Sequence, residues 1–160
     1  MTKPRRSSRH RSREVALQVL YAIDLARTRG EREPVAQEVF DRVAASFEMP
    51  EGAKPFAKEL VCQTDRRRAA LDDILALHAR NWRLARMAAV DRNILRLGTF
   101  ELEHTDTPTP VVLDEAVGLA RRFGSDRSPA FVNGILDAVA RSVRQATSED
   151  VPNGLEDEAG

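Results

Sequence analysis

The chain has little cysteine, few aromatic residues and no long apolar run. Its one cysteine, Cys62, cannot form an internal disulfide. No stretch comes near the ~20 apolar residues that a helix needs to cross a bilayer, and none has the apolar core of a secretory signal. Among 160 residues only 5% are aromatic, and the net charge is zero, so the whole chain has no general attraction to phosphate. These absences argue against a disulfide-stabilised scaffold and a membrane protein, and they favour a single domain in the reducing cytoplasm.

Motifs for catalysis and for metal binding are also absent. The three histidines, His10, His78 and His104, have no Cys or carboxylate at metal-ligand spacing beside them. No glycine-rich phosphate loop and no strained nucleophile turn is recognisable. Cys62 lies on a predicted helix, where a buried thiol is favoured over a reactive one. We therefore expect a binding protein rather than an enzyme, with no metal and no cofactor.

The most distinctive feature that is present is a strongly basic N-terminus. The first thirteen residues contain six Lys or Arg residues and His10 but no carboxylate. Runs of like charge are usually unfolded until a partner neutralises them, so we predict a flexible arm over residues 1–11 that contacts nucleic acid. The alternatives are a solvated tail and a targeting peptide, although the segment lacks the apolar face of a transit peptide. The candidate contacts in and just after this arm are Arg5, Arg6, Arg9, His10, Arg11 and Arg13.

Apolar residues recur at helical spacing along most of the chain, and strand-like alternation is scarce. The pattern predicts one all-α domain over residues 12–146. Its helical stretches are expected at about 12–27, 34–47, 55–78, 84–104, 110–123 and 129–146. Beyond Ala146 the tail at 147–160 carries acidic residues but no Lys or Arg, and its Ser, Pro and Gly content predicts disorder.

Local signals suggest where these helices begin and where they meet. Ser12, Thr109 and Ser128 are predicted N-caps, and the last two are each followed by a proline suited to the first helical position. Gly98 lies inside a helix, where glycine costs ~1 kcal/mol relative to alanine, so we expect another helix to approach closely there. Gly134 is expected to allow the last helix to approach its neighbour.

Four segments together resemble the NusB family of bacterial transcription antitermination factors. They occur in the family's order and spacing, and the match covers roughly residues 9–142; the segments are Arg9–Tyr21, Val90–Leu102, Val111–Val117 and Phe131–Asp137. The resemblance implies an all-α fold of about six or seven helices in two small bundles, and binding of single-stranded boxA RNA. It also implies pairing with NusE, a small-subunit ribosomal protein, and entry into an RNA polymerase complex that reads through terminators, notably in ribosomal RNA operons.

The resemblance assigns RNA contacts at two places in the chain. Phe131 falls on the family's RNA-facing aromatic residue, and Ser128 lies near it. Arg127 stands where the family has an acidic residue, and this difference should strengthen the attraction to RNA. The alternative for Phe131 is a simple core residue. The family's basic motif falls on Arg9, His10, Arg11 and Arg13.

The resemblance also implies contacts with NusE. Tyr21 and Leu25 fall on the partner-facing side of the first helix, and Asp91 falls where the family presents an acidic residue; a solvated charge is the alternative for Asp91. Two other functions stay open. One is an accessory domain of a ribosomal RNA cytosine methyltransferase, although we do not expect the long C-terminal catalytic extension here. The other is a scaffold that self-associates through its first helix without RNA, and a homodimer of the free protein is equally open.

Overall fold

The computed structural model describes residues 5–149 and is helical along most of that length. No strand occurs among these residues, so the predicted all-α fold is confirmed. None of the helices in the described range is long and apolar enough to span a bilayer. The elements are α1 (Arg5–Thr28), α2 (Ala36–Ala44), α3 (Ala53–Arg66), α4 (Arg68–His78), the 3-10 helix η1 (Leu84–Arg86), α5 (Ala89–His104), α6 (Thr109–Phe123) and α7 (Ser128–Glu149).

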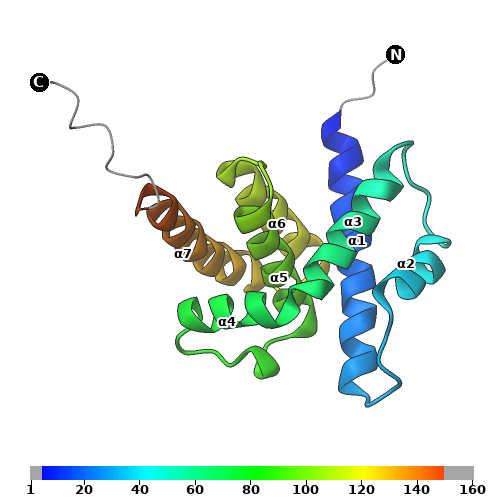
Figure 1. Cartoon of the computed structure of the whole chain (residues 1–160), viewed down its shortest axis with the longest axis horizontal. Helices are drawn as coiled ribbons and strands as arrows, with labels where there is room; N and C mark the ends of the chain where they lie inside the picture. The colour runs from blue at the N-terminus through cyan, green and yellow to red at the C-terminus, as the bar shows by residue number, and fades with distance from the viewer. Residues whose placement is uncertain (1–4, 150–160) are drawn as a thin grey trace, which may run out of the picture.

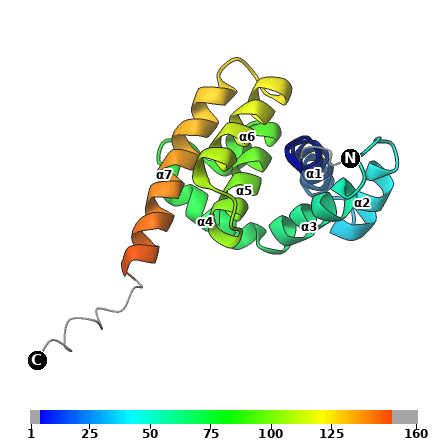
Figure 2. The same cartoon turned by 90° about the horizontal axis from the view of Figure 1, so that it is seen from above.

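The helices form two groups that meet at α5. Helices α1, α2 and α3 pack on one another, and α4 to α7 form the second group (Figure 1, Figure 2). Helix α5 contacts α1 and α3 in addition to α4, α6 and α7. Because it has neighbours on all sides, every residue from Arg92 to Glu101 is buried. The two-bundle arrangement implied by the family resemblance is therefore confirmed.

Apolar side chains at helical spacing connect α1 to the core that it shares with α5. Val15, Val19 and Ile23 recur every four residues and are each at most 1% exposed, so they lie on one face of the helix. Across from them, Ile94 and Leu97 of α5 are equally buried and belong to the same core. Burial of each such side chain contributes roughly 1.5–3 kcal/mol relative to an exposed position.

Charged side chains also cross the boundary between the two groups. Asp24 of α1 accepts hydrogen bonds from Arg92 Nε and Asn93 Nδ2 of α5, both at 2.9 Å. One turn further along α5, Arg96 Nη1 donates to the same Asp24 Oδ2 at 3.5 Å. A buried charge that loses its partner is strongly destabilising. These pairs therefore favour one relative orientation of the two groups.

Helix α1 begins at Arg5 rather than near Ser12, so the predicted start is wrong. The Ser12 hydroxyl lies 3.0 Å from the carbonyl oxygen of Ser8 and 2.7 Å from that of Ala53. Ser12 is thus a buried contact between α1 and α3 and not an N-cap. Residues 1–4 lie outside the described part of the chain, and side chains are described from Ser8 onward, so the predicted contacts Arg5 and Arg6 lie outside the described side chains.

The predicted caps of α6 and α7 are also wrong. Thr109 is the first residue of α6, and no side chain caps that helix. Ser128 is the first residue of α7, and its Oγ accepts a hydrogen bond from the backbone N–H of Ser125 at 2.9 Å. The hydroxyl therefore closes the turn before the helix and does not cap the helix itself. Helix α7 runs to Glu149, beyond the predicted end at Ala146.

The two glycines predicted to allow close packing behave differently. A Cβ atom added to Gly98 would lie 2.7 Å from Leu136 Cδ1 of α7, so the expected close approach is confirmed. Gly134 is exposed, and a Cβ atom there would meet nothing within 4 Å. The expectation for Gly134 is wrong because this residue faces solvent and not a neighbouring helix.

Candidate nucleic-acid interface

The basic start of α1 is held against neighbouring elements. The Arg9 guanidinium lies 5.1 Å from the centre of the Phe56 ring of α3, and that of Arg11 lies 5.3 Å from the centre of Phe47. His10 Nδ1 lies 2.7 Å from Glu115 Oε2 of α6. Residues 8–11, which the sequence predicts as part of a flexible arm, are thus helical and carry cations at defined positions. Stacking of a guanidinium on an aromatic face stabilises an exposed site by ~0.5–1 kcal/mol.

Arg13 faces the interior, in contrast to Arg9 and Arg11. Its side chain is 3% exposed, and Nη2 and Nε donate to the two Glu101 oxygens of α5 at 2.7 and 3.0 Å. This two-point ion pair occupies the edge of the guanidinium that faces Glu101. Arg13 thus joins α1 to α5, and its assignment as an RNA contact stays a prediction.

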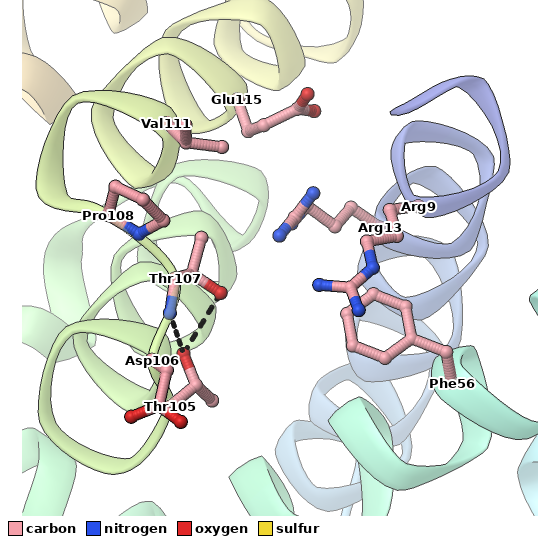
Figure 3. Close-up of a pocket in the computed structure, with 9 residues that line it drawn as sticks. All are labelled: Arg9, Arg13, Phe56, Thr105, Asp106, Thr107, Pro108, Val111 and Glu115. Carbon is pink, nitrogen blue, oxygen red and sulfur yellow. Dashed lines mark hydrogen bonds between the residues drawn. The ribbon is translucent and has the colours of Figure 1, made fainter. Parts of the chain in front are cut away.

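A cavity of about 380 Å³ opens beside the basic start of α1. Arg9, Arg13 and Phe56 border it on one side, and the α5–α6 connection with the start of α6 borders it on the other (Figure 3). On that far side the Thr105 hydroxyl accepts from the Thr107 backbone N–H at 3.3 Å. The cavity therefore has a cationic and aromatic wall facing a polar one.

A second cavity, of about 370 Å³, lies at the opposite end of α5. Its lining includes Arg127 and Phe131 at the start of α7, and Asp91 in the first turn of α5. Phe131 also meets Trp82 edge to face, with the ring centres 5.5 Å apart and the planes at 77°. The structure thus brings together Arg127 and Phe131, as the sequence predicts, and adds an acidic residue assigned to a different partner.

Ser128 and Phe131, the other two residues near Arg127 that are assigned to RNA, differ in their burial. Ser128 is 1% exposed, and its hydroxyl is occupied by the turn at Ser125, so its assignment as an RNA contact stays a prediction. Phe131 is half-buried: it packs on the core and also lines the cavity. Phe131 is therefore partly a core residue, and its contact with RNA stays a prediction.

The residues predicted to contact NusE lie in different parts of the structure. Tyr21 is 37% exposed on α1 and Leu25 is half-buried one turn later. Between them Asp24 is buried in the pairing with Arg92 and Asn93. Tyr21 and Leu25 remain available for an external partner, whereas Asp91 belongs to the cavity at the start of α5.

Three residues of these cavities were missed from the sequence. Phe56 and Trp82 supply aromatic surface, and Arg86 supplies a further cation. Trp82 had a usable signal, because a tryptophan in a non-periodic, arginine-rich stretch has no helical face to occupy. Cys62 was correctly set aside: it lies on α3, and burial raises the pKa of its thiol above the ordinary value, which disfavours the reactive thiolate.

Arginines lie beside aromatic rings at both ends of α5. In this all-α protein, that surface chemistry is typical of a protein that binds single-stranded nucleic acid. The NusB family model matches residues 10–141, and the chain belongs to the NusB family. It is 43% identical over 139 residues to the transcription antitermination protein NusB of Solibacter usitatus, covering 86% of this chain and 91% of that protein. It is likewise 43% identical over 149 residues to the NusB of Anaeromyxobacter dehalogenans, covering 88% and 95%.

Solved structures agree with this assignment. The NusB of T. maritima superimposes with a TM-score of 0.76 at 29% identity, covering 93% of this chain and 99% of that one. A crystal structure of the antitermination factors NusB and NusE in complex with double-stranded RNA gives a TM-score of 0.72 at 29% identity, covering 85% and 98%. The family resemblance drawn from the four sequence segments is thereby confirmed.

Proposed function

We propose that this protein is a transcription antitermination factor that binds single-stranded RNA of the boxA type together with NusE. In this role it joins an RNA polymerase complex in the cytoplasm and supports reading through terminators, notably in ribosomal RNA operons. It acts by binding and carries out no reaction of its own. Its NusB relatives, and a structural neighbour that contains NusB, NusE and RNA, support the proposal.

The observation that carries the proposal is the pairing of cations with half-buried aromatic rings that line cavities at two separate places. Arg9 stacks on Phe56 and makes no ion pair, and Arg127 lines a cavity with Phe131 and likewise makes none among the described residues. Guanidinium groups bind phosphate, and aromatic faces stack on unpaired bases. Unpaired bases are available in single-stranded RNA, which is therefore the ligand that this combination suits best.

The test is a titration of labelled boxA-like RNA against a scrambled RNA at several salt concentrations. We expect selective binding, and we expect Arg9→Gln and Arg127→Gln each to reduce the slope of log affinity against log salt by ~0.7, the value for one phosphate contact on a single strand. Arg42→Gln is the matched control, because Arg42 is exposed on α2 away from both cavities. Equal slopes for all three variants would contradict the proposed RNA surface.

The proposed NusE surface is tested separately. Tyr21→Ala and Leu25→Ala should weaken NusE association, because both remove apolar contact area from the exposed side of α1, while binding of RNA alone stays unchanged. Light scattering during size-exclusion chromatography reports the complex, and it also reports whether the free chain is a homodimer. NusE association of normal strength in both variants would remove this face of α1 from the partner site.

A further inference from the structure

Phe56 of α3 contacts two arginine side chains of α1. The guanidinium carbon of Arg9 is 5.1 Å from the centre of the Phe56 ring, and that of Arg13 is 5.7 Å from it. The two arginines are four residues apart, so they lie on the same face of the helix. All three residues border the cavity beside the basic start of α1 (Figure 3). One aromatic ring therefore serves two successive cations at the edge of this cavity.

The two cations differ in what else holds them. Arg13 is fixed by its hydrogen bonds to Glu101, which is buried with it. Arg9 is exposed, and its guanidinium makes no hydrogen bond and no ion pair among the described residues. In this part of the chain, the stack on Phe56 is thus the one specific interaction of the Arg9 guanidinium. The N–H groups of a guanidinium lie in its plane, so a stack through its face leaves them free to donate.

We infer that Phe56 is a positioning residue for RNA binding, because its ring holds the Arg9 guanidinium at the cavity with the N–H groups free for a phosphate. The inference rests on the proposed RNA-binding function. It adds a residue of α3 that acts through Arg9 and need not touch the RNA. A side chain that is already ordered loses less conformational entropy when it binds, and this gain is the contribution of Phe56 to the affinity.

Phe47 provides a comparison within the same chain. The guanidinium carbon of Arg11 is 5.3 Å from the centre of the Phe47 ring. Arg11 Nε also donates to the Glu48 carbonyl oxygen at 3.3 Å, and Nη1 lies 3.8 Å from Glu14 Oε1. Both rings are half-buried and pack on the core. Loss of the Phe47 ring should therefore release its arginine less than loss of the Phe56 ring does.

The test with RNA is a double-mutant cycle. Phe56→Leu removes the ring but keeps an apolar side chain, and it should weaken binding of boxA-like RNA about threefold, the effect of one exposed cation–π contact. The slope of log affinity against log salt should stay unchanged, because no phosphate contact is removed. In an Arg9→Gln background Phe56→Leu should have no effect, since no guanidinium remains to be held. Phe56→Tyr keeps the ring and should restore wild-type affinity, and Phe47→Leu should weaken binding less than Phe56→Leu.

The order of the Arg9 side chain can also be measured without RNA. Nuclear magnetic resonance relaxation of the arginine Nε–H groups gives an order parameter for each side chain. Arg9 should be more ordered than Arg42, an exposed arginine of α2 with no ion pair among the described residues. In Phe56→Leu the order parameter of Arg9 should fall to the level of Arg42. The comparison in the wild-type protein needs no variant, so it holds even if Phe56→Leu does not fold.

The positioning role fails if Arg9 is as mobile as Arg42 in the wild-type protein, or if Phe56→Leu binds RNA as the wild type does. It also fails if Phe56→Leu weakens binding equally in the Arg9→Gln background, because Phe56 then contacts the RNA itself. In each of these cases a weaker affinity and a smaller salt slope for Arg9→Gln would leave the proposed RNA function standing. Failure of the wild-type protein to bind boxA-like RNA would overturn the proposed function and the inference together.

Discussion

Arg13 and Glu101 form the most deeply buried ion pair of the described chain, with each side chain only 3% exposed. Removing a charge from water is costly, and the cost is offset only when the partner and its hydrogen bonds are in place. Three hydrogen bonds between these groups meet that condition. A cation in the basic motif of this chain thus contributes to the joint between the helical groups.

We predict that Glu101→Ala lowers the free energy of unfolding by ~3–5 kcal/mol, because it leaves the Arg13 guanidinium buried without a partner. The double variant Arg13→Met with Glu101→Leu should recover much of that loss, since it removes both charges and keeps the volume. Urea denaturation measures both effects. The control is Lys58→Ala, which breaks an exposed pair with Asp41 and should cost no more than ~1 kcal/mol. A Glu101→Ala effect as small as the control would mean that Arg13 is not held in the interior.

Helices α5 and α7 pack closely because α5 has a glycine at the contact. Leu136 of α7 is fully buried, and its Cδ1 occupies the space that a side chain at position 98 would need. Gly118 of α6 is also inside a helix, but a Cβ atom there would meet nothing within 4 Å. Both glycines therefore carry the same cost of placing glycine inside a helix, but only Gly98 is packed closely against another helix.

Gly98→Ala should therefore lower the melting temperature, because the overpacking cost of ~1–3 kcal/mol outweighs the ~1 kcal/mol gained in helix propensity. Gly118→Ala should raise the melting temperature, since only the gain applies. In a Leu136→Ala background the vacated space should turn Gly98→Ala from destabilising into stabilising. Thermal unfolding of the four variants decides the point. Gly98→Ala that stabilises the wild-type protein as Gly118→Ala does would show that Leu136 moves aside freely.

The two candidate RNA sites lie at opposite ends of one helix, and this separation limits the RNA that can reach both. The first cavity borders the residues that follow α5, and the second borders its first turn. Helix α5 has 16 residues, or ~24 Å at ~1.5 Å per residue. At ~3.4 Å per phosphate of a stacked strand, about seven nucleotides are needed to span that length.

We predict that a twelve-nucleotide RNA binds at least ten times more tightly than a tetranucleotide of matching composition, because only the longer strand makes both sets of contacts at once. Either Arg9→Gln or Arg127→Gln should reduce that ratio, and Arg42→Gln should leave it unchanged. Fluorescence anisotropy at constant salt gives the ratio. Equal affinities for the two lengths would show that the cavities do not act on one strand.

Local sequence patterns determined the helical class, the NusB relationship and most helix boundaries after residue 84. Apolar spacing and breaks such as Gly124 act within one or two turns, so they can be read without knowledge of distant contacts. The early start of α1 could not be read in this way. Its arginine-rich first turns have no apolar period, and the contacts seen there are made to Phe56, Phe47 and Glu115, which are remote in the sequence.

Tertiary structure alone decided which of the predicted site residues are available to a ligand. Arg9 and Arg13 are one helical turn apart and border the same cavity, yet Arg9 makes no ion pair among the described residues while Arg13 is paired with a glutamate 88 residues away. In the same way Asp91 and Phe131 come from different helices and meet in one cavity. Charge and spacing identify a candidate group, but its freedom to bind depends on whether a distant opposite charge already occupies it, and only the folded chain brings such partners together.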